Sequence, residues 1–343
     1  MKVLLYLNGT EGHQTGIEDG FNYLKEKGRV TGLQWFYYQE YERNNGHQAT
    51  ISEIVRMAQA FQPDIIVFYH LAKFRIDEAT LATLKGLASK PLLAYDEGDM
   101  YGGIAKPISK QMRAIMKMSD AVSIRGLGAI SEQIRKINPA IVYTPHHADI
   151  ARFDQAPYIL EQRKYPMVLI GNKVQSRILS SLLSIPGAKA RERVIRYIDR
   201  HFPNEFHLFG NGWNGIRSHR GAVDFQKQME IYRNSWITVA YEHYPGIANY
   251  FSNRLPIALM AGSLYVCHYH QGYENIFKNC DFIFFYKTKQ ELYNVLKYLF
   301  SLSEENLLER SRNARAFALA NYTPQVVWSN FLENIQKTAK QHG

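Results

Sequence analysis

Three carboxylates lie within four residues of one another, at Asp96, Glu97 and Asp99. They directly follow the apolar run Pro91–Tyr95, which is typical of a buried strand. Ligands of open α/β sheets bind beyond the carboxyl ends of the strands, so a carboxylate at this point is well placed to deprotonate a hydroxyl group. Tight turns also favour Asp and Gly, and plain turn chemistry is the alternative. The sequence favours Asp99 and Glu97 over Asp96 as the catalytic base.

A second set of candidate bases lies in the glycine-rich loop of residues 8–16, where Glu11 and His13 follow the first apolar run of the chain. Either side chain competes with the carboxylates after Tyr95 for the role of catalytic base. His70 ends a later apolar run and is interpreted as a hydrogen-bonded histidine of the core.

An arginine lies beside a predicted helix start at Arg254. If Asn253 caps this helix, Arg254 takes the first helical position and Pro256 the third, where its missing N–H group costs nothing. Free N–H groups beside a guanidinium suit a diphosphate. The alternative is an ordinary capped helix with a surface arginine.

Charge and composition limit the function classes. The chain has 343 residues with 41 Lys and Arg against 31 Asp and Glu, a formal net charge of +10 that indicates an anionic partner. Nucleotide phosphates, a membrane surface or a nucleic acid would satisfy it, but no known nucleic-acid-binding module is recognisable. Two cysteines exclude a disulfide framework and predict a cytoplasmic protein. No His, Cys and carboxylate pattern has metal-site spacing, so no metal or other cofactor is expected.

Short apolar runs alternate with segments of helical period along the whole chain, which predicts α/β domains with parallel sheets. The length favours two domains. Residues 1–150 form the predicted first domain, 151–165 the linker, 166–320 the second domain and 321–343 a C-terminal helix that is expected to pack back on the first domain. The predicted strands of the first domain are Val3–Asn8, Gly32–Tyr38, Asp64–His70, Pro91–Tyr95, Ala121–Ile124 and Ile141–Thr144. Those of the second are Met167–Gly171, Phe206–Phe209, Trp236–Tyr241, Leu264–His268 and Phe282–Tyr286.

Four sequence blocks occur in a suggestive order: Phe209–Trp213, Asn253–Gly262, Gly272–Phe277 and the segment from Asn321 to Trp328. Together they resemble the donor-binding half of GT-B glycosyltransferases, and among these the spore-maturation (CgeB-like) group. The resemblance covers roughly residues 165–335, and the N-terminal half matches in architecture only. It implies an α/β fold of the GT-B class, with two Rossmann-like domains facing a central cleft and with C-terminal helices.

One departure from the resemblance concerns the donor. In the related group-1 enzymes, two glutamates eight positions apart contact the donor and the second binds the ribose, whereas this sequence has Asn249 and Ile257 at those positions. Isoleucine accepts no hydrogen bond, so Glu274 is a candidate for the ribose. The absence of the glutamate pair favours inversion at the anomeric centre without deciding between inversion and retention.

The resemblance also implies where the donor binds. Lys173 and Arg177 are candidate phosphate ligands, Gly212 flanks the base, and His243, Tyr244 and Gly246 line the sugar pocket. The complete set of expected donor-binding residues is Arg254, Asn253, Lys173, Arg177, Gly212, His243, Tyr244, Gly246, Asn249 and Glu274.

Five basic side chains lie on one predicted helix: Lys189, Arg191, Arg193, Arg196 and Arg200. Their spacing is typical of a solvated face, and a surface for an anionic membrane or an acidic acceptor is the alternative.

The function that the resemblance implies is a bacterial hexosyltransferase-type glycosyltransferase. It would move a sugar from a UDP-, GDP- or dTDP-sugar to a hydroxyl group of a glycan, lipid-linked glycan or other acceptor, in surface polysaccharide or glycoconjugate synthesis. It would work in the cytoplasm or at the inner face of the membrane, without nucleic acid. The alternatives are a nucleotide-sugar epimerase, a catalytically inactive GT-B binding protein and, less favoured, a nucleic-acid binder.

Overall fold

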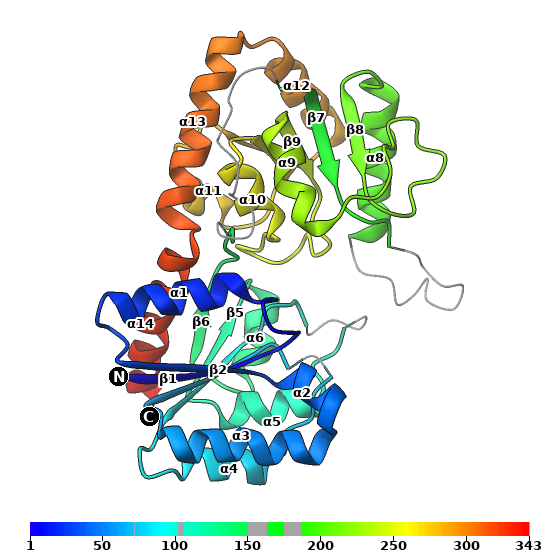
Figure 1. The fold of residues 1–343 in the computed structure, drawn as a ribbon. Coiled ribbons are helices and arrows are strands. Elements are labelled where there is room, and N and C mark those ends of the chain that lie inside the picture. Colours follow the sequence, from blue (N-terminus) through cyan, green and yellow to red (C-terminus); the bar gives the residue numbers. More distant parts are fainter. Residues whose placement is uncertain (72, 102–105, 150–162, 175–186, 343) are drawn as a thin grey trace. The chain divides into compact units, whose positions relative to one another are not determined.

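The computed structural model describes residues 1–71, 73–101, 106–149, 163–174 and 187–342. The chain divides into two compact units, which are Met1–His146 with Pro324–Gly343 (unit 1) and His147–Thr323 (unit 2). Each unit contains a parallel sheet flanked by helices (Figure 1). Most of the expected linker, residues 151–162, lies outside the described residues, and Tyr165 already belongs to a strand. None of the helices in the described ranges is long and apolar enough to cross a membrane.

Unit 1 is built on a six-stranded sheet with the order β2-β1-β3-β4-β5-β6. All neighbouring strands in it are parallel. The strands are β1 (Lys2–Leu7), β2 (Gly32–Tyr37), β3 (Ile65–Tyr69), β4 (Leu92–Asp96), β5 (Ala121–Ile124) and β6 (Ile141–Tyr143).

Alternating side chains of β1 show how the sheet of unit 1 is covered. Val3 and Leu5 pack with the core residues of α1 and α14, whereas Leu4 and Tyr6 pack with those of α3, α4 and α5. Figure 1 shows α3, α4 and α5 together on one side of this sheet. The helices of unit 1 are α1 (Thr15–Glu26), α2 (Tyr38–Asn45), α3 (His47–Phe61), α4 (Glu78–Lys85), α5 (Lys110–Met118), α6 (Ala129–Arg135) and α14 (Pro324–His342).

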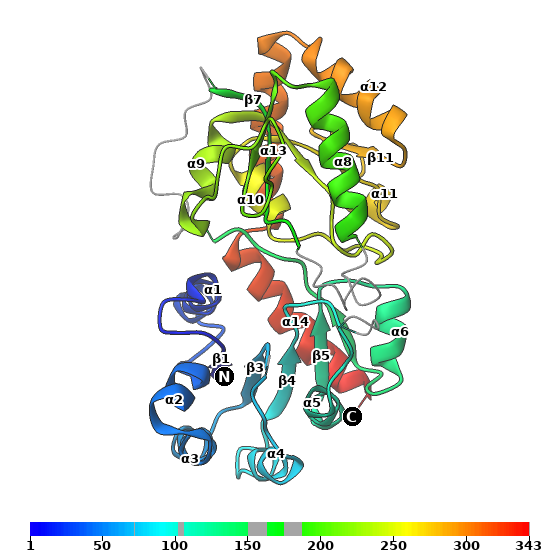
Figure 2. The same cartoon turned by 90° about the vertical axis from the view of Figure 1, so that its right-hand side faces the viewer.

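Unit 2 has a five-stranded parallel sheet with the order β11-β10-β9-β7-β8. The strands are β7 (Tyr165–Ile170), β8 (Phe206–Phe209), β9 (Ser235–Ala240), β10 (Leu264–His268) and β11 (Ile283–Tyr286). The helices are α8 (Ala188–His201), the 3₁₀ turn η2 (Phe225–Lys227), α9 (Gln228–Arg233), α10 (Arg254–Met260), α11 (Tyr273–Ile276), α12 (Lys289–Phe300) and α13 (Glu304–Asn321). The end of α8 lies beside α12 (Figure 2). The ring centroids of Phe202 and Tyr293 are 5.4 Å apart there.

The predicted strands are all present, with ends that differ by two residues or fewer. Helix α2 was not predicted, because Tyr38 continues the aromatic run of β2 and hides the helix start. The alternation of the aromatic run Trp35–Tyr38 predicts a strand that is buried on both faces, and this prediction is wrong. β2 is an edge strand, and Trp35 and Phe36 are therefore half-buried.

Candidate active site

The strand order marks one place in each sheet where a ligand is expected. In unit 1 the chain reverses direction across the sheet between β1 and β3, and in unit 2 between β7 and β9. Ligands of doubly wound sheets bind beyond the carboxyl ends of the two strands at such a switch point. We use the term carboxyl edge for the polar residues and the glycine at the carboxyl ends of these and the adjacent strands. In unit 1 they end or follow strands: Asn8, His70, Asp96, Glu97, Asp99 and Arg125. In unit 2, Gly171, Glu242 and His243 follow strands, and Arg191 and Arg254 belong to the helices α8 and α10.

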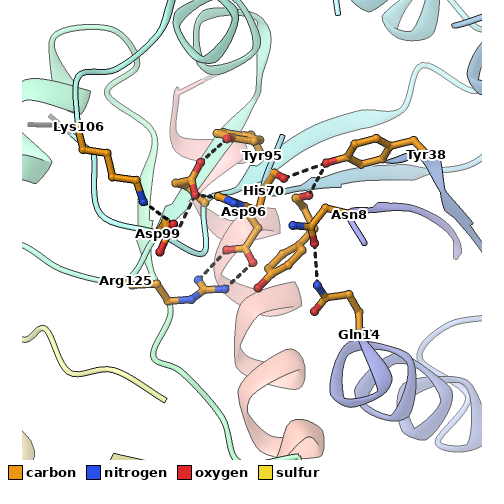
Figure 3. Close-up of polar contacts among 11 residues, drawn as sticks. Asn8, Gln14, Tyr38, His70, Tyr95, Asp96, Asp99, Lys106 and Arg125 are labelled. Atoms are coloured by element: carbon orange, nitrogen blue, oxygen red, sulfur yellow. Dashed lines mark hydrogen bonds and ion pairs between the residues drawn. The ribbon is translucent and has the colours of Figure 1, made fainter. Parts of the chain in front are cut away.

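A histidine held by a buried glutamate lies at the carboxyl edge of unit 1. Nδ1 of His70, directly after β3, is 2.5 Å from Oε1 of Glu97, directly after β4 (Figure 3). Glu97 is 1% exposed, and it also accepts hydrogen bonds from the hydroxyl of Tyr95 and from the backbone N–H of Asp99, the latter at 2.8 Å. Three donors therefore fix this carboxylate, and the carboxylate in turn fixes the imidazole ring.

The charge of Glu97 also tunes His70. Burial of the imidazole disfavours its charged form, but the hydrogen bond and the negative charge of Glu97 outweigh burial and raise the pKa of His70. His70 is hydrogen-bonded as expected, but its side chain is 16% exposed at the carboxyl end of β3, so its placement in the core is wrong. A partly exposed imidazole that is oriented by a buried carboxylate has the arrangement of a general base.

The other two carboxylates after β4 have different surroundings. Both oxygens of Asp96 accept hydrogen bonds from Arg125, at 2.7 and 2.6 Å, and the two side chains are 0% and 3% exposed. Asp99 is 54% exposed and forms an ion pair with Lys106, whose ammonium lies 4.2 Å from the centroid of the Tyr101 ring. Asp96 is thus fully occupied by a structural partner, whereas Glu97 and Asp99 remain next to His70.

The two candidate bases in the loop of residues 8–16 are exposed to solvent. Glu11 and His13 are both exposed, and the His13 ring packs over Gly9. Two side chains of α2 accept hydrogen bonds from N–H groups of this loop: Gln39 accepts from Gly9 at 2.9 Å, and Glu40 accepts from Glu11 at 2.8 Å. These N–H groups are therefore not available to cradle a phosphate.

A buried glutamate also organises the carboxyl edge of unit 2. Glu242 follows β9 and its side chain is 2% exposed. It accepts a hydrogen bond from Ser252 at 2.9 Å, and Nη2 of Arg254 lies 3.3 Å from its Oε2. Burial alone would raise the pKa of Glu242, but Arg254, Ser252, His270 and Arg191 outweigh burial and lower it. Glu242 is therefore charged and is the partner of Arg254.

The helix that carries Arg254 does not begin as expected. Asn253 is at the N-cap position, but its side chain makes no capping hydrogen bond, and its own backbone is already helical (φ −55°, ψ −18°). The N–H of Leu255 donates to the carbonyl of Ser252 at 3.1 Å, so the first turn is closed by backbone alone. The expectation of an Asn-capped helix with free N–H groups is wrong, and the anion-binding potential lies in the Arg254 side chain instead.

A second arginine reaches this edge from α8. Arg191 is 3% exposed, and its Nη1 lies 2.8 Å from Nε2 of His243, which follows Glu242. Its Nε has no hydrogen-bond partner among the described residues. A side chain at Gly171 would collide with it, because a Cβ atom there would lie 1.8 Å from Nη2 of Arg191. The end of β7 thus makes room for this guanidinium.

Burial and mutual repulsion lower the pKa values of Arg191 and His243. Burial, and next the positive charge of Arg254, lower the pKa of Arg191 to about 9. Burial, then Arg191 and Arg254, lower the pKa of His243 to about 4, so this imidazole is neutral near pH 7. The edge therefore holds two guanidinium groups, one carboxylate and one neutral histidine.

The burial of Arg191 corrects the expectation for the basic helix. Lys189, Arg193, Arg196 and Arg200 are exposed, as a solvated face requires, but Arg191 is on the buried face with Val194, Ile195 and Ile198. The signal was present in the sequence: Arg191 precedes Val194 and Ile195 by three and four positions, which places it on the apolar stripe.

Lys173 and Gly212 meet beside the end of β7. Nζ of Lys173 forms an ion pair with Glu192 at 2.9 Å, so this cation already has a partner. Gly212 (φ +84°) packs against the Lys173 side chain, and the indole N–H of Trp213 donates to the carbonyl of Gly171 at 2.6 Å. Arg177, the neighbouring phosphate candidate, lies outside the described residues.

The remaining donor candidates lie in the loop after β9 and, for Glu274, in the short helix α11 after β10. The ring of Tyr244 packs against Tyr250, and Gly246 is exposed. Asn249 has a left-handed backbone (φ +58°) and its side chain lies against Gly272. Glu274 is exposed and accepts hydrogen bonds from the Tyr269 hydroxyl at 2.8 Å and from the Gly272 N–H at 3.1 Å.

Ile257 is 1% exposed in the core of unit 2. Its side chain is therefore packed away and contributes no polar group to the edge. Among the residues that the structure describes, no group of three or more His, Cys, Asp or Glu side chains is arranged to hold a metal ion.

Comparison with known sequences places a family match over unit 2. A family model described as "Glycosyl transferase-like" matches residues 189–333, which is less than half of the chain and includes Arg191, Glu242, His243 and Arg254. None of the curated proteins matches the sequence.

Comparison with solved structures identifies the fold. A structure described as trehalose-6-phosphate from E. coli bound with UDP-2-fluoro glucose gives a TM-score of 0.63 at 9% identity, covering 98% of this chain and 99% of that chain. Anabaena HepE in complex with UDP and glucose gives 0.59 at 12% identity, covering 98% and 99%. An alpha,alpha-trehalose-phosphate synthase (UDP-forming) from Burkholderia vietnamiensis gives 0.61 at 9% identity, covering 99% and 98%. These similarities confirm the predicted α/β fold of the GT-B class.

Proposed function

We propose that this chain is a glycosyltransferase, which takes a sugar from a nucleoside diphosphate sugar and transfers it to a hydroxyl group of an acceptor. The observation that carries the proposal is the sharing of one carboxylate, Glu242, by two arginines, Arg191 and Arg254, at the switch point of unit 2. Buried charges are normally paired with an opposite charge, but the two arginines at this edge have one carboxylate between them among the described residues, and the second partner of Arg191 is the neutral His243. The diphosphate of a donor would supply the missing negative charge.

Both carboxyl edges have a role in the proposed reaction. The bond between the anomeric carbon and the diphosphate oxygen breaks, and a bond forms between that carbon and the acceptor oxygen. The two guanidinium groups stabilise the negative charge that grows on the leaving diphosphate. The acceptor proton passes to Nε2 of His70, because Nδ1 is already hydrogen-bonded to Glu97. Glu97 is then a positioning residue, which acts through His70.

Finer features of the proposal rest on the sequence motifs. The blocks Phe209–Trp213 and Asn253–Gly262 support an enzyme similar to the spore-maturation group, with a UDP-, GDP- or dTDP-sugar as donor. A glycan or lipid-linked glycan is the proposed acceptor. The four exposed basic side chains of α8 would suit an anionic membrane surface near such an acceptor.

The proposal is tested with a donor panel. Thermal unfolding of the full chain is followed with UDP, GDP, dTDP and ADP and with their glucose or mannose conjugates. A ligand at a hundredfold excess over its Kd stabilises the folded chain by about 2.7 kcal/mol, so at least one compound should raise the melting temperature by several degrees. Release of the nucleoside diphosphate from the stabilising donor is then measured with and without acceptor glycans.

The Arg254→Gln variant links the result to unit 2. A charge-assisted hydrogen bond contributes about 1.5–3 kcal/mol, so donor affinity should fall about 10- to 150-fold in this variant. Arg312→Gln, on the exposed side of α13, is the matched control and should bind the donor normally. If no nucleoside diphosphate or sugar conjugate stabilises the wild-type chain at millimolar concentration, the proposed function is wrong.

A further inference from the structure

In the hydrogen bond between Arg191 and His243, the identity of the donor fixes the protonation state of His243. A guanidinium only donates hydrogen bonds, so Nε2 of His243, 2.8 Å from Nη1 of Arg191, must act as the acceptor. The imidazole is therefore unprotonated at Nε2 in this arrangement. An anion that enters beside Arg191 needs donors, and Nε2 of His243 supplies one only if it gains a proton.

The surroundings of His243 already contain more positive than negative charge. Among the described residues, the charged groups that face His243 are Arg191 from α8, Arg254 from α10 and Glu242 at the end of β9. Glu242 is engaged by Ser252 and Arg254. Arg191 is 97% buried, with an Nε that has no partner in the described part of the chain. Within the described ranges, Arg191 therefore has no carboxylate of its own.

We propose that Arg191 and His243 form a phosphate-binding pair beside Arg254, and that His243 takes up one proton from solvent when a diphosphate binds. The inference rests on the proposed function and adds two residues and a proton to it. In the empty site, neutral His243 accepts from Arg191. In the occupied site, phosphate oxygens accept from Arg191 and from the protonated Nε2 of His243.

The linkage between proton binding and ligand binding gives the expected pH dependence of the affinity for a diphosphate. Burial, and next the two arginines, hold the pKa of His243 at about 4 in the empty site. If a bound diphosphate restores it to the ordinary value of about 6.5, the affinity should be about tenfold higher near pH 5.5 than near pH 7.5. The sign follows from the direction of the shift, because a ligand that raises a pKa is bound more tightly as the pH falls through the raised value.

The ligands used as probes must have no ionisable group of their own that titrates between about pH 5.5 and 7.5. UDP-glucose, GDP-mannose, dTDP-glucose and ADP-glucose are suitable, because their diphosphates are esterified at both ends and lack the ionisation near pH 6 of a terminal phosphate. Their affinities for the full chain are measured by calorimetry at about pH 5.5 and 7.5, in buffers with different ionisation enthalpies. The best-bound probe should show uptake of close to one proton near pH 5.5, as the same linkage requires.

Four variants separate the pair from the rest of the edge. His243→Asn should abolish the pH dependence. Arg191→Met and Gly171→Ala should weaken binding at both pH values by about tenfold or more, the first by removing the guanidinium and the second by displacing it. Arg193→Gln, on the exposed side of the same helix, should change neither.

Stability gives an independent readout for Arg191. Its removal relieves repulsion with Arg254, so the melting temperature of ligand-free Arg191→Met should equal or exceed that of the wild type. Binding that needs Arg254 but is insensitive to pH, to Arg191→Met and to Gly171→Ala would overturn this inference and leave the proposed function standing. Failure of all four probes to bind the wild-type chain would overturn both.

Discussion

The two carboxyl edges are built on the same strand order but differ in how charge is balanced. In unit 1, each carboxylate has its own basic partner: Asp96 with Arg125, Glu97 with His70, and Asp99 with Lys106. In unit 2, Arg191 and Arg254 share Glu242. A balanced edge can hold and move a proton without attracting an anion, whereas an edge with surplus positive charge favours an anionic ligand.

The same comparison explains why two histidines at strand ends behave in opposite ways. His70 and His243 each follow a strand and are each partly buried. The carboxylate of Glu97 raises the pKa of His70, whereas burial and two arginines lower that of His243. His70 is therefore suited to accept a proton from a neutral hydroxyl group, and His243 to accept one only together with an anion.

The largest expected effect concerns the proton acceptor of unit 1. His70→Gln should lower turnover about 10²- to 10⁴-fold, the usual contribution of a general base, and should leave donor affinity unchanged. His47, which pairs with Glu42 on the surface of the same unit, gives the matched control, and His47→Gln should retain full turnover. Equal turnover of the two variants, measured as nucleoside diphosphate release with acceptor, would remove His70 from the mechanism.

The next effect concerns the stability of unit 1. Asp96→Asn leaves the buried Arg125 without its counter-charge and should lower the free energy of unfolding by about 3–5 kcal/mol. Glu53→Gln breaks an exposed pair with Arg56 and should leave the unfolding transition unchanged. Denaturant unfolding of both variants measures the difference. An Asp96→Asn chain as stable as the wild type would show that the pair is not a structural support.

A smaller, pH-dependent effect is expected for Glu97→Gln. Removal of the carboxylate should lower the pKa of His70, so the acid limb of the rate profile should move to lower pH. The raised pKa stabilises the wild type fully at low pH, and this stabilisation is lost as the pH rises through that pKa. The gap in melting temperature between wild type and Glu97→Gln should therefore narrow from acid to alkaline pH. A gap that widens would contradict the pairing.

The smallest effect is expected for Lys173→Ala at the edge of unit 2. Lys173 is already paired with Glu192, and a partly exposed pair of this kind contributes about 0.2–1 kcal/mol. Donor affinity should change about fivefold or less, far less than in Arg254→Gln. A loss as large as that of Arg254→Gln would show that Lys173 leaves Glu192 to bind phosphate.

The sequence predicted the sheets because their strands are apolar on both sides and β-branched or aromatic, a pattern that few other elements share. It also selected Glu97, which directly follows a strand, and Arg254, which begins a helix, whereas His243 was selected through the family resemblance. The prediction that Asn253 caps α10 is wrong, because the carbonyl of Ser252 closes the first turn of this helix and the Asn253 side chain makes no capping hydrogen bond.

The pairing of His70 with Glu97 could not be seen along the chain, because it depends on register. β3 and β4 pair so that Tyr69 lies opposite Asp96, which brings the residues that follow them side by side. Arg191 was missed for a different reason. Its charge suggested a solvated face, and its place on the apolar stripe of α8 was the overlooked signal.

The most direct test compares donor affinity and turnover in wild type, His70→Gln and Arg254→Gln with one nucleoside diphosphate sugar. Calorimetry gives the affinity, and release of the nucleoside diphosphate in the presence of acceptor gives the turnover. We expect His70→Gln to bind the donor like the wild type and to lose turnover, and Arg254→Gln to lose affinity. Loss of donor affinity in His70→Gln together with wild-type affinity in Arg254→Gln would contradict the assignment of proton transfer to unit 1 and diphosphate binding to unit 2.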